Sequence, residues 1–526
     1  MATMRDTNIP STQHDTSQGQ DYSSENSQGY IMALDAGTTS VRAIIFDEYG
    51  CKVSQSTREL GISYPRPGWV QQDPVEILSA QIACMVEVQF VTGIHSERIR
   101  AVGISNQRET VVVWDRKTGQ PIYDAIVWQC RRTTPIMDAL VADGYTELIR
   151  NKTGLVPDAY FSGSKIKWIL ENVNGAREMA DDGRLMCGTV DSWLIYNLTH
   201  GEVHATDYTN ASRTMLFDIH KLRWDEELCE MLGIPMSMLP EARPSISDYG
   251  LVSNDIMTNR VPIAGVAGDQ QAALFGHCCF EPGSVKNTYG TGCFLLMNTG
   301  DKPVQSEHGL VTTIGIAESD SVDYALEGSI FQAGSVIQWL RDEMRLINSA
   351  EETCEIAQSV PSTDGCYIVP AFTGLGAPWW KPRVRASITG ITRATNRATV
   401  VRAGCESMAY QTYDILKAME VDSGHDVSSL EVDGGASKNE FIMQFQADLL
   451  NCEVIRPEVD ETTALGAAYL AGLSVGYWQD REELQANREV AASYQPQMDA
   501  ATREELLAGW REALRQIMSS SPSAQQ

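Results

Sequence analysis

The stretch "IMALDAGTTSVRAIIFD", residues 31–47, decides the fold. An apolar run ends at Asp35, a small and hydroxyl-rich turn follows at residues 36–40, and a second apolar run rich in β-branched residues completes the stretch. This pattern predicts two strands joined by a tight turn. Glycine and threonine are common both in ordinary hairpin tips and in loops that hold a phosphate group, so the turn alone leaves both interpretations open.

The elements after this hairpin argue against the common nucleotide-binding folds. Asp73 as N-cap and Pro74 at the first helical position predict a helix that reaches about Val91. In a dinucleotide-binding or P-loop unit the glycine turn leads directly into a helix, whereas here it leads into another strand. The predicted strands of this region cover residues 31–34, 41–47, 51–59, 98–105 and 109–115.

The second half of the chain repeats this order. Residues 261–271 are an apolar strand that ends at Asp269 and is followed by a helical pattern. Residues 284–300 form a strand, a Gly-Thr-Gly turn and a strand, and residues 428–450 form a strand that ends at Asp433, a Gly-Gly turn and an amphipathic helix. We therefore predict a duplicated α/β domain, with the boundary near residues 276–284.

The two hairpin turns and the strand-terminal aspartates together favour phosphoryl transfer. Backbone amides at a glycine turn form an anion nest, and threonine and serine hydroxyls extend it around a phosphate. Arg42 adds a positive charge just past the first turn. Of the carboxylates Asp35 and Asp269, one could position Mg²⁺ and the other could take a proton from an attacking hydroxyl.

Composition excludes several classes of protein. Of the 526 residues, 41 are Lys or Arg and 69 are Asp or Glu, a formal net charge of −28, so we expect no nucleic-acid partner.

Twelve cysteines without C-x-x-C spacing favour free thiols and a cytoplasmic location. No run approaches 18 apolar residues, and residues 1–28 lack the apolar core of a signal peptide, so we expect no membrane span. P-loop, Rossmann, protein-kinase, zinc-protease and hydrolase motifs are absent.

The chain resembles the glycerol kinases of the FGGY carbohydrate kinase family, within the actin/hexokinase/Hsp70-like ATPase superfamily. The resemblance runs from about residue 30 to 516, and "NQRET" with "IVWQCRR" is typical of glycerol kinases rather than of the sugar kinases of the family. The stretches that carry it include "ALDAGTTSVRAIIFD" (33–47), "GISNQRETVVVWD" (103–115), "YDAIVWQCRRT" (123–133), "GDQQAALFGH" (268–277), "NTYGTGCFLLMNTG" (287–300), "YALEGSIFQAGSVIQWLRDE" (324–343) and "VDGGASKNEFIMQFQADLL" (432–450).

This resemblance implies an α/β fold with two duplicated ribonuclease-H-like (actin-like ATPase) domains that flank an active-site cleft. The N-terminal domain would span residues 29–277 and carry the glycerol and phosphate side. The C-terminal domain would span residues 278–516 and carry the nucleotide side. The polar composition of residues 1–28 predicts a disordered N-terminal tail, and residues 517–526, which the resemblance does not cover, would be a disordered C-terminal tail.

The resemblance also implies roles for single residues. Asp269 would be the general base on the terminal hydroxyl of glycerol, and Asp35 and Asp269 would be the carboxylates at the Mg²⁺ site. By residue type alone, Trp128 and Phe294 would be core residues and Arg108-Glu109 a surface ion pair. The implied glycerol pocket consists of Arg108, Glu109, Trp128, Tyr160, Asp269, Gln270 and Phe294. The implied ATP site consists of Thr38, Thr39, Ser40, Arg42, Gly290, Thr291, Gly334, Gln338, Gly435 and Asn439.

The sequence departs from the family pattern at a few positions. Ala36 replaces the usual glutamine after the first aspartate, and the region 381–399 differs from the family signature at Lys381, Arg383, Ala386, Ala394 and Thr399. The predicted function is ATP-dependent phosphorylation of glycerol to sn-glycerol 3-phosphate by a homo-oligomer, a dimer or tetramer. The alternatives are a kinase for another small polyol or ketose, and a non-catalytic nucleotide-binding paralogue.

Overall fold

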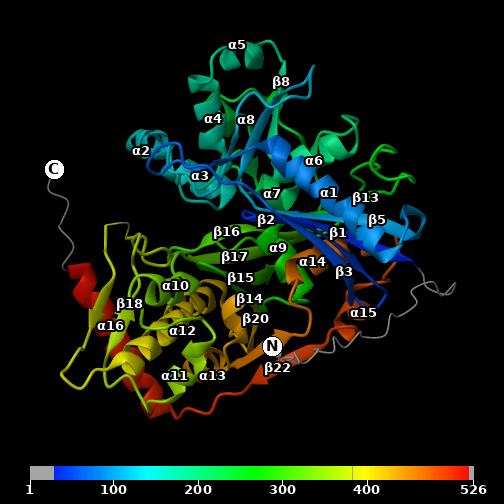
Figure 1. Cartoon of the computed structure of the whole chain (residues 1–526). Helices are drawn as coiled ribbons and strands as arrows, with labels where there is room; N and C mark the ends of the chain where they lie inside the picture. Colours follow the sequence, from blue (N-terminus) through cyan, green and yellow to red (C-terminus); the bar gives the residue numbers. More distant parts are fainter. Residues whose placement is uncertain (1–28, 382, 520–526) are drawn as a thin grey trace, which may run out of the picture.

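The structure is a computed structural model that describes residues 29–381 and 383–519. It consists of two α/β halves, with the first half of the chain at the top of Figure 1 and most of the second half below it. The predicted tail 1–28 lies outside the described residues. Helix α16 (Ala500–Ser519) includes residues 517–519, so the predicted C-terminal tail begins later than residue 517, and residues 520–526 lie outside the described residues.

The first sheet has five strands in the order β13-β5-β1-β2-β3. β1 is antiparallel to β2 and parallel to β5, and β13 is parallel to β5. Every residue of β1 is buried, as expected for a strand covered on both faces. The strands are β1 (Tyr30–Ala36), β2 (Ser40–Phe46), β3 (Lys52–Glu59), β5 (Ile99–Asn106) and β13 (Ile263–Gly268).

The second sheet has the order β16-β17-β15-β14-β20-β21-β22. Its five inner strands, β17-β15-β14-β20-β21, repeat the directions of β3-β2-β1-β5-β13, because β14 is antiparallel to β15 and parallel to β20. The predicted duplication is therefore confirmed. The strands are β14 (Val285–Tyr289), β15 (Cys293–Gly300), β16 (Val311–Ala317), β17 (Val322–Ile330), β20 (Ser429–Gly434), β21 (Glu453–Pro457) and β22 (Val490–Tyr494).

The strand predicted at 109–115 begins later than expected. β6 spans Val111–Asp115, and Glu109 has a φ of 61°, which no strand residue adopts. Residues 107–110 therefore form a turn at the end of β5. In the second sheet, the short helix η3 (Gly435–Lys438) follows β20 at the equivalent position, so both segments lie at the carboxyl end of a parallel strand.

The predicted helix after Asp73 is α1 (Pro74–Thr92), and the Asp73 side chain accepts a hydrogen bond from the Val75 amide, which confirms the N-cap. α1 packs against β2 and β3. Among the described helices, α1 alone has the length and apolar composition that a membrane-spanning helix needs. A single helix of this kind is weak evidence for a membrane span, because a core helix of a globular protein meets the same criteria.

Two central helices join the halves. α9 (Asp269–Gly276) follows β13, and α14 (Thr462–Ser474), although late in the chain, packs against α9, β1, β5 and β13 of the first sheet (Figure 1). Glycines allow this close approach. A Cβ on Gly103 would lie 2.0 Å from the Ala467 carbonyl oxygen, and a Cβ on Gly466 would lie 1.8 Å from that of Ala272.

Smaller layers surround the two sheets. In the first half a four-stranded sheet, β4-β7-β6-β8, packs with a group of short helices in a separate core. Its other strands and its helices are β4 (Gln71–Gln72), β7 (Ala125–Ile126), β8 (Leu185–Thr189), α2 (Thr134–Ala142), α3 (Thr146–Thr153), α4 (Ser162–Asn172), α5 (Ala176–Asp181) and α8 (Glu226–Leu232). α6 (Val190–Leu198) packs in the core of the first sheet instead, and α7 (Tyr208–Ala211) contributes to a small core with β16 and β17. The remaining elements of at least five residues are α10 (Gly334–Asp342), α11 (Glu352–Gln358), α12 (Arg397–Ser423), α13 (Glu440–Leu450) and α15 (Arg481–Ala486).

The region that departs from the family pattern lies mostly on the surface. Lys381, Arg383, Ala386 and Ala394 are exposed, and neither alanine is among the described residues with positive φ, so neither position requires glycine. Thr399 is buried in the first turn of α12, where its amide donates to the Asn396 cap. All twelve cysteines are free thiols, as predicted.

A buried acid in α6 should make stability depend on pH. Burial, together with the charge of Asp207, raises the pKa of the Asp191 carboxyl to about 7, although Thr206 donates a hydrogen bond of 2.6 Å to it. The pKa of Asp191 in the folded state therefore exceeds its unfolded value of about 3.9. The stabilisation of the folded state by the protonated carboxyl is complete below about pH 3.9 and is lost as the pH rises through about 7.

Asp191→Asn removes this ionisation. Relative to the wild type, the variant should gain about 2–3 kcal/mol more stability at pH 8 than at pH 5. Thermal unfolding of both proteins at the two pH values measures the effect. The same difference in melting temperature at pH 5 and pH 8 would contradict the assignment.

Candidate functional site

The two hairpin turns occupy equivalent positions in the two sheets. Residues 37–39 connect β1 to β2, and residues 290–292 connect β14 to β15. In the first turn, the Thr38 carbonyl accepts from Gln72 (2.7 Å) and the Thr39 carbonyl accepts from the Leu60 amide (2.9 Å). These bonds fix the turn that carries the hydroxyls of Thr38, Thr39 and Ser40.

The second turn packs against the beginning of α10. The Gly334 amide donates to the Gly290 carbonyl (3.1 Å), and the Ser335 amide donates to the Thr291 carbonyl (3.1 Å). A Cβ on Gly334 would lie 2.5 Å from the Gly290 carbonyl oxygen, so this contact requires glycine. The structure thus brings together Gly290, Thr291 and Gly334, and Gln338 is exposed one turn further along α10.

The Gly-Gly turn after β20 lies beside the second hairpin. Gly434 has a φ of 84°, and a Cβ there would lie 2.3 Å from the Tyr289 carbonyl oxygen, whereas a Cβ on Gly435 would meet nothing within 4 Å. Open space at Gly435 suits a ligand that approaches the backbone closely. Asn439 caps α13 by accepting from the Ile442 amide, and its amide group donates to Thr353 (2.9 Å).

Asp35 is the penultimate residue of β1 and lies beside the first turn. Its carboxylate accepts from the Ser105 hydroxyl (2.8 Å) and lies 3.7 Å from the Arg42 guanidinium. Burial raises the pKa of Asp35, and the Arg42 charge opposes this shift. Arg42 also forms an ion pair with Glu461, at the beginning of α14, so it joins the first turn to the late part of the chain.

Asp269 is the first residue of α9. Its carboxylate accepts from the Gln270 amide (2.8 Å) and lies 3.3 Å from the Arg108 Nε. Burial raises its pKa above the usual range, Arg108 and Lys286 oppose this shift, and the charge of Asp35 adds to it. A carboxylate with a raised pKa is the better proton acceptor, which suits a general base.

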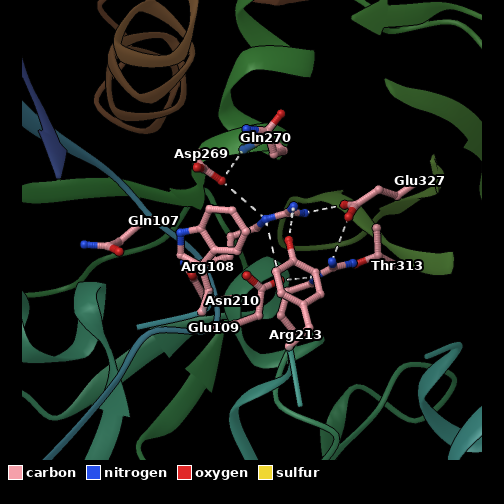
Figure 2. A network of polar contacts seen from close by, with 12 residues as sticks. Gln107, Arg108, Glu109, Asn210, Arg213, Asp269, Gln270, Thr313 and Glu327 are labelled. Carbon is pink, nitrogen blue, oxygen red and sulfur yellow. Dashed lines mark hydrogen bonds and ion pairs between the residues drawn. The ribbon is translucent and has the colours of Figure 1, made fainter. Parts of the chain in front are cut away.

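The expectation of a surface ion pair at Arg108-Glu109 is wrong. Both side chains are 2% exposed, and they lie 3.8 Å apart inside a network shown in Figure 2. Arg108 also donates to the Tyr160 hydroxyl (3.3 Å) and forms an ion pair with Glu327 of β17. The pair is buried because charged partners from both halves surround it, and sequence neighbours do not reveal such partners.

Three aromatic side chains line one side of this network. The Trp128 ring lies 5.6 Å from the Tyr160 ring and 6.2 Å from the Phe294 ring, both at steep angles. The Trp128 indole also donates to the Thr38 hydroxyl (3.0 Å). Trp128 and Phe294 are both partly buried. Trp128 packs against the core of the four-stranded sheet, whereas Phe294 belongs to none of the core clusters of the described residues, so the assignment as a core residue by residue type alone is wrong for Phe294. Trp128 also connects the first turn to the strand that follows the second turn.

Sequence reasoning missed three charged residues of this region. Glu327 accepts from Arg108 and Arg213, and Lys286 of β14 donates to the Gln270 side chain and to the Thr288 hydroxyl (2.9 Å). Burial lowers the pKa of Lys286 to about 8, against the charges of Asp433 and Asp269. For Lys286 and Glu327, the available signal is a charged residue within a strand, because such a residue is buried only when it has a partner. Arg213 lies between α7 and β10, so this signal does not apply to it.

The described residues offer few carboxylates for a metal. Within 29–381 and 383–519, no group of three or more His, Cys, Asp or Glu side chains forms a metal-ligand set. Asp35 and Asp269 are close enough for the charge of one to affect the other. Such a pair is compatible with Mg²⁺, which keeps several waters and needs only one or two protein carboxylates.

Comparisons with known proteins agree across nearly the whole chain. Residues 30–276 match the N-terminal domain of the FGGY family of carbohydrate kinases, and residues 285–475 match its C-terminal domain. Glycerol kinase 1 of Clostridium tetani is 58% identical over 489 residues, which cover 93% of this chain and 98% of that protein. Glycerol kinase 2 of Thermotoga maritima is 57% identical over 485 residues, which cover 92% and 98%.

Solved structures show the same fold. A Plasmodium falciparum glycerol kinase with ADP matches with a TM-score of 0.88 at 39% identity, covering 93% of this chain and 98% of that one. A ligand-bound xylulose kinase from Lactobacillus acidophilus matches with a TM-score of 0.84 at 21% identity, covering 94% and 99%, and shows the likeness of fold alone.

Proposed function

The chain belongs to the FGGY family of carbohydrate kinases, and we propose that it transfers the terminal phosphoryl group of ATP to glycerol, giving sn-glycerol 3-phosphate and ADP. The observation that carries this proposal is the meeting of charged and aromatic side chains from both halves. Arg108 contacts Asp269 and Tyr160, and Trp128 contacts Tyr160 and Phe294. With Glu109 and Gln270, these are the seven residues assigned to the glycerol pocket.

This group of residues suits a small triol. The carboxylates of Asp269 and Glu109 can accept hydrogen bonds from hydroxyl groups, and Arg108 can donate them. Trp128 and Phe294 can cover the carbon chain. A site built from buried polar groups discriminates strongly against analogues that lack a hydroxyl, because the polar partners are then left unpaired.

In the proposed reaction, the Asp269 carboxylate accepts the proton of the terminal glycerol hydroxyl as its oxygen bonds to the γ-phosphorus of ATP. The bond between the γ-phosphorus and the β,γ-bridging oxygen breaks, and ADP leaves with that oxygen. Arg108, 3.3 Å from Asp269, orients the carboxylate. Positioning and charge neutralisation supply most of the catalysis in reactions of this class.

The nucleotide would lie against the two hairpin turns. Thr38, Thr39, Ser40 and Arg42 would contact the phosphates from the first half, and Gly290 and Thr291 from the second. Gly334, Gln338, Gly435 and Asn439 would contact the adenosine. Open space at Gly435 supports this placement. The Asn439 side-chain oxygen accepts from the Ile442 amide and so caps α13, and Asn439 would contact the adenosine while it keeps this hydrogen bond.

Asp35 and Asp269 would hold Mg²⁺. Burial raises the pKa of Asp35, so a cation beside it would stabilise the ionised form of this carboxyl. Bound with ATP, the ion would neutralise charge on the phosphate oxygens. A cytoplasmic location, expected from the free cysteines, and assembly into a dimer or tetramer complete the proposal.

A substrate panel tests the proposed specificity. The purified chain with ATP should phosphorylate glycerol with a kcat/KM at least about 100-fold above those for dihydroxyacetone, xylulose and gluconate, since unpaired buried polar groups penalise a poor fit. A preference for one of the other three would instead establish a kinase for another polyol or ketose. Nucleotide binding without phosphorylation of any of the four would favour the non-catalytic paralogue.

A further inference from the structure

Glu327 lies in β17 of the second sheet, between Leu326 and Gly328, and is 1% exposed. Both of its carboxylate oxygens are used. One forms an ion pair with the Arg108 guanidinium, and the other accepts from the Arg213 Nη2 at 2.8 Å. Figure 2 shows the carboxylate facing both guanidinium groups. Burial alone would raise the pKa of Glu327, but the two arginines hold it at about 2, so the group is ionised.

Arg213 closes the network. Its Nε donates to the Glu109 carboxylate at 2.6 Å, and Glu109 in turn lies 3.8 Å from Arg108. Two arginines and two glutamates therefore alternate in a closed ring, which we call the charge ring: Arg108, Glu327, Arg213 and Glu109. The four formal charges balance within the ring, and every member is at most 2% exposed.

We propose that Glu327 is a positioning residue for glycerol: through Arg108 and Arg213 it holds the side chains of the substrate pocket in place from the opposite half of the molecule. This inference rests on the proposed function. Glu327 is not among the residues assigned to the pocket, and it acts through two residues that reach the pocket.

The geometry explains how one carboxylate positions several groups. Arg108 uses Nη1 for Glu327, Nε for Asp269 (3.3 Å) and Nη2 for Tyr160 (3.3 Å). Because the guanidinium group is planar and rigid, a bond that fixes Nη1 also fixes the directions in which Nε and Nη2 donate. The same carboxylate holds Arg213, which fixes Glu109. Glu327 thus determines the orientation of one pocket base, one pocket hydroxyl and one further pocket acid.

The charge ring also makes the pocket dependent on both halves. Arg108, Glu109 and Arg213 belong to the first half, whereas Glu327 belongs to the second sheet. Phe294 of β15 reaches Trp128 across the same boundary. The glycerol side is therefore complete only when the halves adopt the arrangement seen here, and Glu327 is a charged contact at the pocket that stabilises this arrangement.

Three variants of the full chain test the proposal. Glu327→Gln removes the charge while keeping the shape. Glu327→Asp keeps the charge but shortens the side chain, so that it no longer reaches both arginines. Glu406→Gln is the matched control, since Glu406 is 2% exposed and pairs with Arg402 at 2.7 Å within α12, away from the charge ring. The measurements are kcat and KM for glycerol, ADP affinity by calorimetry, and the thermal midpoint.

Glu327→Gln should lower kcat/KM for glycerol by about 100-fold, because displacing an orienting group by about 1 Å costs that much. Glu327→Asp should lower it by about tenfold, by the same mechanism of partial misplacement. ADP affinity should stay within twofold for both, and Glu406→Gln should stay within threefold throughout. If the Gln variant fails to fold, the Asp variant decides.

A folded Glu327 variant with glycerol kcat/KM within threefold of the wild type would overturn the proposal. An equal fall in glycerol and ADP affinities would also overturn it, since that result indicates a general structural role. A wild type that phosphorylates another polyol but not glycerol would overturn the proposed function instead. The same variants, measured on that polyol, would then still decide the role of Glu327.

Discussion

Asp269→Asn should lower kcat for glycerol phosphorylation by about 10³-fold or more, because general-base catalysis contributes about 10²–10⁴-fold. The asparagine side chain has nearly the same shape and can still accept a hydrogen bond from the Gln270 amide, which donates to Asp269 at 2.8 Å. It cannot accept a proton at neutral pH. Glycerol binding, measured by calorimetry, should therefore remain detectable while turnover is lost.

The matched control for Asp269 is Asp191→Asn. Asp191 is a fully buried acid of the same half, bonded to Thr206 and away from the pocket, so its conversion to asparagine should leave turnover near that of the wild type. Near-normal turnover of Asp269→Asn would remove Asp269 from the role of general base. Loss of turnover in both variants would show that buried acids of this half matter for folding rather than for proton transfer.

Arg108→Lys should lower kcat/KM for glycerol by about 10³-fold, since arginine and lysine are not interchangeable where a planar group bonds in several directions. Arg108 contacts Glu327 through Nη1, Asp269 through Nε and Tyr160 through Nη2. A lysine has one nitrogen and cannot reach these three partners at once. Steady-state kinetics with varied glycerol and saturating ATP measures the loss.

An arginine-to-lysine change at an exposed position is the control for Arg108→Lys, because it keeps the charge and has no buried partners to lose. Arg58 pairs with Glu87 on the surface, with both side chains about half exposed, so Arg58→Lys should change kcat/KM by less than twofold. The thermal midpoint of Arg108→Lys should also fall, because Glu109, Asp269 and Glu327 then lose a buried partner. Unchanged glycerol kinetics in Arg108→Lys would contradict the pocket described here.

Much of the fold could be predicted from local patterns. The strand-turn-strand units at 31–47 and 284–300 are confirmed as β1-β2 and β14-β15, and the equal directions of five strands in each sheet confirm the duplication. These predictions succeeded because apolar alternation, glycine turns and caps are local signals. The beginning of β6 was misplaced because Glu109 adopts a left-handed conformation that no local pattern indicates.

The contacts between the halves could not be predicted in the same way. Arg108 and Glu327 are separated by 219 positions, and nothing near either residue specifies the other. The packing of α14 on the first sheet depends on small residues at Gly103 and Gly466, whose importance appears only when two backbones meet. The burial of Arg108 and Glu109 depends on these long-range contacts, which the local sequence does not reveal. The sequence alone therefore favours a surface ion pair at these two residues.

The purified full-length chain should release ADP from ATP and Mg²⁺ in a coupled assay when glycerol is added, at a rate at least about tenfold above the rate without glycerol, within the usual kcat range of 1–100 s⁻¹ for kinases. This measurement tests most directly the claim that the residues around Arg108 and Asp269 bind glycerol for phosphoryl transfer. A folded protein whose ADP release does not change on addition of glycerol would contradict that claim.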